Sequence, residues 1–181
     1  MKGSSCRVVE GRIAGVASNV ALKIFIFHDL KHVVFALREG LDLQIAGNVN
    51  VGPRFFGFYV TPDGELALVM EKMDGFSLQA SGANFVNEQT IEDFKGQIQR
   101  LRKEGYAFSG DGGEMLIGKD GSVQFVDVLL RCLDEDGTFE QMGPFIDPKT
   151  GAEIFPAEIV TPEKSDWYLR YLRKLSTPSP F

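Results

Sequence analysis

Residues 20–39 read VALKIFIFHDLKHVVFALRE, and this stretch decides the fold because a strand is followed almost directly by a long helix. Its first seven residues alternate between two sets of side chains, which is typical of a β-strand. Asp29 then supplies an N-cap for a helix that we expect to continue to about Ala46. Gly47 and Asn48 provide its stop signal.

The predicted helix carries apolar side chains on two sides. The first stripe consists of Leu30, Val33, Val34, Leu37, Leu41 and Ile45, and the second of Phe35, Ala36, Leu43 and Ala46. A helix that is apolar on both sides is expected to pack on both sides. Glu39 falls within the second stripe, so its carboxylate should point inward, where a buried charge needs a partner.

Working outward, periodicity and turn residues predict the remaining elements. The expected strands lie within 7–26 and at 53–60, 66–70, 115–117 and 123–128, and the expected helices lie at 90–103 and 165–175. Thr90 and Asp93 have capping-box spacing, and Ser165 is the expected N-cap of the last helix. Residues 134–164 are expected to be irregular because they are polar and rich in Pro and Gly.

This order predicts an α+β domain made of two lobes. We expect one domain over residues 1–181, with a small antiparallel sheet and one helix in an N-lobe at about 1–72. A polar break at about 71–76 serves as the hinge, and a mainly helical C-lobe follows at about 77–181.

Composition excludes several classes of function. The chain has 181 residues and a formal net charge of −6, which disfavours binding to nucleic acid and to anionic membranes. No apolar run approaches the roughly 20 residues of a membrane-spanning helix, and residues 1–6 lack the apolar core of a signal peptide. The two cysteines lie far apart, so we expect a cytoplasmic protein without disulfides.

Five segments together resemble the protein-kinase family. Val20-Ala21-Leu22-Lys23 resembles the strand that ends in the ATP-orienting lysine of that family, and residues 68–75 resemble the strand that enters the hinge. Residues 109–111 followed by 121–127 resemble the catalytic loop and the metal-binding strand. The other two are residues 38–58, which are similar to small-molecule and bacterial kinases, and residues 165–167, which resemble the start of a central helix. The matches are collinear over about residues 20–175.

The resemblance assigns ATP-binding roles to six residues. Lys23 would contact the phosphates of ATP, with Glu39 as the carboxylate that holds it. Glu71 and Met73 would offer backbone groups to the base. Gly11 and Gly15 would belong to a phosphate-covering turn, although their spacing departs from the family pattern and leaves too few residues before Lys23 for two full strands.

The resemblance also implies a Mg²⁺ site and a catalytic base. Asp127 would be a metal ligand, and independently of the resemblance a carboxylate among apolar neighbours needs a partner or a metal. Glu114 would be the second ligand, because Glu can replace Asp or Asn towards Mg²⁺. Asp111 is our choice for the base; the alternative register places Ser109 there, which could not serve, and a third interpretation makes Asp111 a simple turn residue.

The resulting hypothesis is an ATP- and Mg²⁺-dependent phosphotransferase. It would be a minimal, atypical protein kinase that transfers the γ-phosphate to a hydroxyl of a protein substrate, similar to the small kinases of bacterial effectors, toxins or phages. Such an effector would act in a host cytosol. One alternative is a pseudokinase or another non-catalytic binding module. Another is a small-molecule kinase, because residues 52–54 and 109–111 resemble aminoglycoside-type phosphotransferases.

Overall fold

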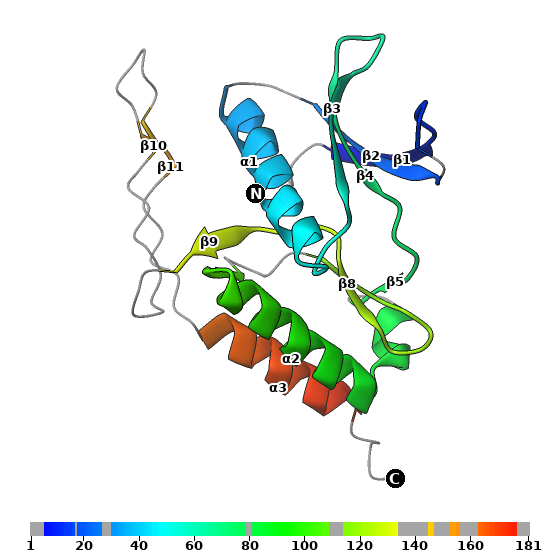
Figure 1. Ribbon diagram of the computed structural model, residues 1–181, viewed down its shortest axis with the longest axis vertical. Helices are drawn as coiled ribbons and strands as arrows, with labels where there is room; N and C mark the ends of the chain where they lie inside the picture. The colour runs from blue at the N-terminus through cyan, green and yellow to red at the C-terminus, as the bar shows by residue number, and fades with distance from the viewer. Residues whose placement is uncertain are drawn as a thin grey trace.

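A four-stranded antiparallel sheet holds the first part of the chain (Figure 1). The computed structural model describes residues 6–16, 18–26, 30–78, 81–108, 114–133, 145–146, 153–155 and 163–176. The strands of this sheet are β1 (Cys6–Gly11), β2 (Val20–Phe25), β3 (Phe55–Val60) and β4 (Leu66–Glu71), in the order β1-β2-β4-β3. Its two hairpins arise from local turns, and in the second Gly64 adopts a φ of 82° that glycine accommodates without strain.

Helix α1 (Leu30–Asn48) packs against this sheet through the second of its two predicted stripes. Ala36, Leu43 and Ala46 are completely buried, and Gly40 is needed because a Cβ there would lie 2.4 Å from the ring of Phe58. The first stripe is not covered to the same extent. Its Leu37 and Leu41 side chains remain exposed, so the expectation of packing on both sides holds for only one side within the described residues.

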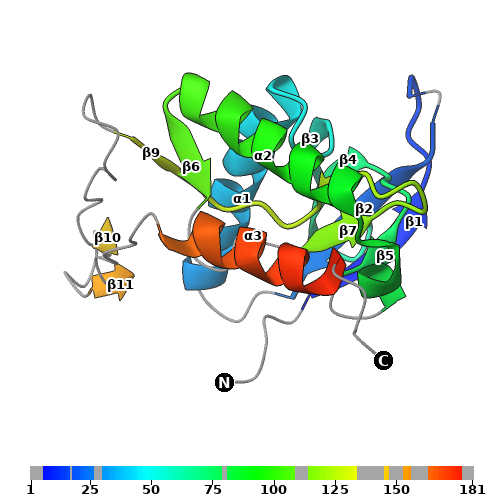
Figure 2. The ribbon, with the colours of Figure 1, turned by 90° about the horizontal axis from the view of Figure 1, so that it is seen from below.

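Two helices lie side by side below the sheet, α2 (Glu88–Lys103) and α3 (Glu163–Ser176) (Figure 2). The predicted capping box of α2 was wrong by three residues. Asn87 is the N-cap, and its side chain and that of Thr90 each accept a hydrogen bond from the backbone N–H of the other. Asp93 instead accepts the backbone N–H of Val123 at 2.8 Å. Helix α3 begins before Ser165, so that residue does not cap it.

The second part of the chain is less helical than predicted, because small sheets separate its helices. β5 (Phe76–Ser77), β7 (Met115–Ile117) and β8 (Val123–Phe125) form one sheet, and β6 (Tyr106–Phe108) pairs with β9 (Leu130–Cys132). A 3-10 helix covers Ser81–Phe85, and β10 (Phe145–Ile146) pairs with β11 (Glu153–Phe155), where an irregular segment was expected. The architecture is therefore α+β, with small antiparallel sheets and three α-helices in the described residues.

An aromatic cluster joins α2 to these small strands. Phe125 of β8 is fully buried, and the centroid of its ring lies 4.3 Å from that of Phe108 and 5.8 Å from that of Phe94. Because this cluster holds β8, it also fixes the position from which the chain continues to Asp127.

Among the helices in the described residues, none has the length and apolar character to cross a bilayer.

Candidate active site

A buried ion pair joins the sheet to helix α1. The Nζ atom of Lys23 on β2 donates to Oε1 of Glu39 on α1 at 2.6 Å. Lys23 is 7% exposed and Glu39 is 0% exposed. Removing two charges from water is costly, and their attraction repays this cost only with close geometry. The arrangement therefore confirms that the Glu39 carboxylate points inward and has a partner.

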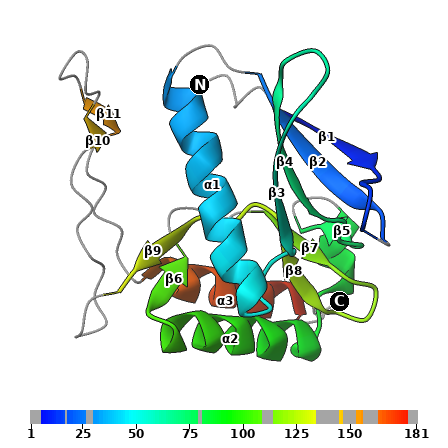
Figure 3. The same ribbon diagram turned by 45° about the horizontal axis from the view of Figure 1, so that its top comes forward.

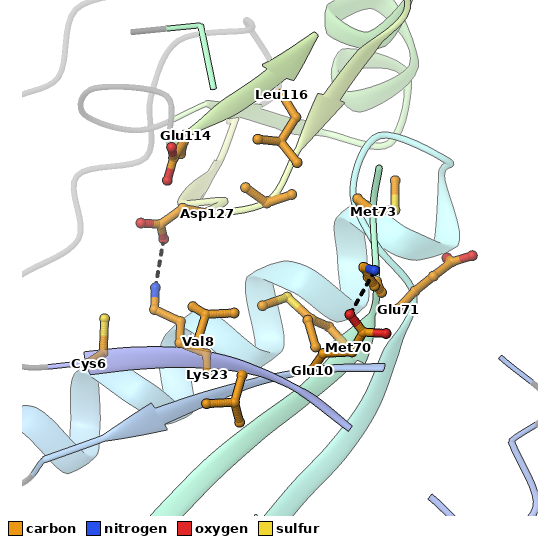
Figure 4. A pocket seen from close by; sticks show the side chains of 14 residues that line it. Cys6, Val8, Glu10, Lys23, Met70, Glu71, Met73, Glu114, Leu116 and Asp127 are labelled. Carbon is orange, nitrogen blue, oxygen red and sulfur yellow. Dashed lines mark hydrogen bonds and ion pairs between the residues drawn. The ribbon is translucent and has the colours of Figure 1, made fainter. Parts of the chain in front are cut away.

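A second carboxylate approaches the same ammonium group from a distant part of the chain. Oδ1 of Asp127, which follows β8, lies 3.3 Å from Nζ of Lys23 (Figure 4). Its side chain is 44% exposed, so it can meet both Lys23 and solvent. Lys23 thus has one fully buried carboxylate behind it and one accessible carboxylate in front of it.

Lys23 and Asp127 line a cavity of about 410 Å³ between the sheet and the β7–β8 hairpin, and the buried Glu39 reaches it only through Lys23. The carboxylates of Glu114 and Asp127 lie at the same end of this cavity as Lys23 (Figure 4). The walls between the two ends are apolar, with Val8, Val9, Ala21, Met70, Leu116 and Val126. At the other end the chain passes from β4 through Glu71 and Met73.

Local structure explains why these elements converge. Lys23 lies in the middle of β2, paired with Val8 on one side and Leu68 on the other, so both neighbouring strands hold it. After β8, the N–H of Val126 donates to the carbonyl of Glu114 at 3.0 Å, which links the two acidic segments. The predicted strand at 123–128 therefore ends at Phe125, because the next residues turn towards Lys23.

The linker after β4 runs very close to the opposite wall of the cavity. A Cβ at Gly75 would lie 2.9 Å from the Cβ of Leu116, so a larger residue would push the linker away from β7. At the cavity edge, Nζ of Lys72 lies 2.8 Å from Oε2 of Glu10 and ties the linker to β1. This pair raises the pKa of Lys72 and lowers that of Glu10, in both cases first through their hydrogen bond.

Burial and charge act against each other at the central pair. Burial alone lowers the pKa of Lys23, but the carboxylates of Glu39 and Asp127 outweigh it and raise that pKa above its ordinary value. Burial raises the pKa of Glu39 to about 7, although the Lys23 ammonium group opposes this. Oε2 of Glu39 is buried and has no hydrogen-bond partner among the described residues, which is consistent with a carboxyl group that is reluctant to ionise.

The raised pKa of Glu39 predicts that stability falls as pH rises from about 4.5 to about 7. In that window the folded protein keeps a proton that the unfolded chain has released, so deprotonation favours unfolding. We expect the free energy of unfolding to be about 2–3 kcal/mol greater at pH 5 than at pH 7.5 from this group. Urea titrations across this range should show the trend in the wild type and lose that part of it in Glu39→Gln. Equal pH dependence in both proteins would contradict the prediction. Asp42 acts in the same direction, because burial raises its pKa to about 6, and it should account for the dependence that persists in Glu39→Gln.

The structure brings together six of the predicted site residues and separates two. The residues that line the cavity or pair with one that does are Lys23, Glu39, Glu71, Met73, Glu114 and Asp127. Gly11 ends β1 and Gly15 lies in the following turn with φ of 85°, and neither lines the cavity. Gly11 has a packing reason instead, because a Cβ there would lie 2.5 Å from Cδ1 of Leu22. Asp111 and Ser109 lie outside the described residues.

Sequence reasoning missed the contribution of β1 to the cavity. Cys6, Val8 and Glu10 alternate along this strand and line the cavity together with Val9. Their spacing of two residues was the signal that could have placed them on one face of the strand. That face contains both apolar and charged side chains, so the sequence does not identify it as buried.

Two accessible carboxylates are typical of a Mg²⁺ site and too few for a metal ion that side chains alone enclose. Asp127 and Glu114 line the same end of the cavity, and within the described residues no group of three or more His, Cys, Asp or Glu side chains could enclose an ion. Mg²⁺ is commonly held by one or two carboxylates together with water and substrate phosphates. The residues present fit such a site, in which Asp127 and Glu114 would be the protein ligands.

Comparison of the chain with family models and with curated proteins gave no match in either case.

Proposed function

We propose that the protein binds ATP in this cavity and transfers its γ-phosphate to a hydroxyl group of a protein substrate. The single observation that carries the proposal is the convergence of Glu39 and Asp127 on the ammonium group of Lys23, from positions 16 and 104 residues further along the chain. Phosphoryl transfer depends on positioning and on neutralising charge, and a lysine fixed by two carboxylates can do both. A solvent-facing strand lysine would not need them.

Each end of the cavity has a distinct task in this proposal. Lys23 donates to phosphate oxygens, while Glu39 keeps its ammonium group charged and oriented. The apolar wall formed around Met70 and Leu116 takes the flat base, and backbone groups near Glu71 and Met73 read its edge. Mg²⁺ held by Asp127 and Glu114 would offset the negative charge of the phosphates. Asp111 stays our prediction for the group that accepts the proton of the attacking hydroxyl.

This reading includes a two-lobed, kinase-like arrangement. The sheet β1-β2-β4-β3 and α1 would form the N-lobe, residues 71–76 the hinge, and the chain from 77 onward the C-lobe. The order strand, helix, hairpin, linker, helix and hairpin supports it, as does a cavity lined from both sides of the linker.

Thermal unfolding with ATP, with and without Mg²⁺, tests the proposal. A ligand that binds only the folded protein at a hundred times its Kd adds about 2.7 kcal/mol of stability, which raises the Tm of a chain of this size by roughly 5–10 °C. We expect that rise with Mg²⁺ and ATP together, and its loss in Asp127→Asn. Asp63→Asn is the matched control, because Asp63 is an exposed aspartate in the β3–β4 turn.

No rise in the wild type at millimolar ATP would contradict the proposal. A rise without phosphate transfer to any protein would favour the non-catalytic binding module. Transfer to a small molecule in place of a protein would favour the small-molecule kinase.

A further inference from the structure

Helix α1 forms side-chain hydrogen bonds with the backbone of one residue, Leu130, in the segment that follows Asp127. The backbone N–H of Leu130 donates to Oδ2 of Asp42 at 3.1 Å, and its carbonyl accepts from Nη2 of Arg38 at 3.4 Å. Nε of Arg38 lies 3.8 Å from the same Oδ2 atom of Asp42. We call these two side chains and the backbone of Leu130 the clasp.

The clasp lies outside the proposed active-site cavity. Arg38, Asp42 and Leu130 line a separate groove of about 450 Å³ along the first apolar stripe of α1. Figure 3 shows β9, which begins at Leu130, next to α1. Asp42 is only 8% exposed, and the proposed phosphate transfer does not use it. A carboxylate in such a place is costly unless it accepts hydrogen bonds. Both backbone polar groups of Leu130 bind side chains of α1 that lie one helical turn apart. The clasp therefore fixes the distance of Leu130 from α1 and its position along the helix axis.

The clasp and the ion pair act on the same two elements. On an α-helix, Glu39 and Asp42 are about 60° apart around the axis and about 4.5 Å apart along it. Glu39 reaches Asp127 through Lys23, and Asp42 reaches Leu130 directly. A rotation or slide of α1 that breaks one connection therefore strains the other. The two connections together allow one register between α1 and residues 127–130.

We propose that Arg38 and Asp42 are positioning residues, which hold α1 and residues 127–130 in the register where Lys23 contacts both Glu39 and Asp127. The inference rests on the proposed function as far as nucleotide affinity is concerned. The effect of the clasp on the ion pair itself can be measured without a nucleotide.

Two readouts on the full chain test this role. The first is the affinity for ATP with Mg²⁺ measured by calorimetry. The second is the ¹H–¹⁵N NMR signal of the Lys23 ammonium group, which slow exchange makes visible when the group is buried between carboxylates. We expect Asp42→Ala to weaken ATP binding at least tenfold and to shift or remove the Lys23 signal. Asp42→Asn keeps an oxygen for the N–H of Leu130. Its affinity for ATP should therefore lie within about threefold of the wild-type value, and its Lys23 signal should appear at the wild-type position.

Asp63→Ala is the control, because Asp63 is an exposed aspartate in the β3–β4 turn, remote in the fold from the clasp. It should leave the Lys23 signal and the affinity unchanged. If Asp42→Ala fails to fold, Arg38→Met replaces a less buried member of the clasp and should give a smaller loss in the same direction. A folded clasp variant with the wild-type Lys23 signal and affinity would overturn the inference. If the wild type binds no ATP, the proposed function fails, and the Lys23 signal alone decides whether the clasp sets the ion pair.

Discussion

Replacing Lys23 by Met should weaken binding of ATP with Mg²⁺ by about 100-fold or more and should destabilise the fold. Truncating one member of a buried, hydrogen-bonded charge pair costs about 2–5 kcal/mol, much of it from the charge left behind. Glu39 is fully buried, and Lys23 is the partner that its Oε1 atom contacts. In the variant it must either stay charged without a cation or take up a proton. We therefore expect a loss of about 3–5 kcal/mol at pH 8, measured by urea unfolding, and a smaller loss at pH 5.5.

The double variant Lys23→Met/Glu39→Gln separates fold from function. It removes the stranded carboxylate, so stability at pH 8 should return most of the way to the wild type. Binding of ATP should stay lost, because no cation meets the phosphates. Normal ATP binding by folded Lys23→Met would show that Lys23 serves the fold alone. Equal instability of the single and double variants would show that the unpaired charge is not the cause.

Replacing Phe125 by Ala should cost about 3–5 kcal/mol of stability, the usual range for a fully buried Phe. The ring is completely buried against Phe94 and Phe108, which belong to α2 and β6. Neighbours drawn from two different elements cannot easily close the cavity that the ring leaves. The urea midpoint should fall accordingly, with no change in its dependence on pH between 5 and 7.5.

Phe58→Ala is the control for this substitution, because Phe58 is the same residue type at 39% exposure. We expect it to cost roughly 1 kcal/mol, since half-exposed apolar surface contributes less. Equal losses in the two variants would mean that the aromatic cluster is not a centre of stability. Phe125 also lies two residues before Asp127, so Phe125→Ala should weaken ATP binding at temperatures where the variant is still folded.

Local signals explain which parts of the fold were predictable. The strand at Val20, the helix that begins at Leu30 and the hairpin around Gly64 follow from alternation, helical periodicity and turn residues close together in the chain. Asp29, the predicted N-cap of that helix, lies outside the described residues. The short strands β6 and β9 could not be predicted in this way. Each has three residues, which is less than two periods of alternation, and they pair across a separation that no local pattern reveals.

The candidate site shows the same division. Glu39 and Asp127 were singled out because a carboxylate stood among apolar neighbours, and Lys23 because its strand resembles that of protein kinases, and all three lie together. Gly11 and Gly15 were chosen as parts of a phosphate-covering turn, yet one makes room for Leu22 and the other shapes a turn away from the cavity. Glycines serve both needs, so their presence alone cannot locate a phosphate site. The clasp could not be predicted from the sequence. Asp42 and Arg38 bind the backbone of Leu130, and any residue type offers the same backbone groups.

The separation of 104 residues between Lys23 and Asp127 also has a consequence for biosynthesis. Ribosomes add about 5–20 residues per second, so Asp127 is made roughly 5–20 s after Lys23. The partners Lys23 and Glu39 are only 16 apart and can meet as soon as β2 and α1 have emerged. The Lys23–Glu39 pair can therefore form in the nascent chain before Glu114 and Asp127, which flank the β7–β8 hairpin, have been synthesised. We expect the proposed nucleotide site to be completed in a single late step, when that hairpin packs against a sheet that is already formed.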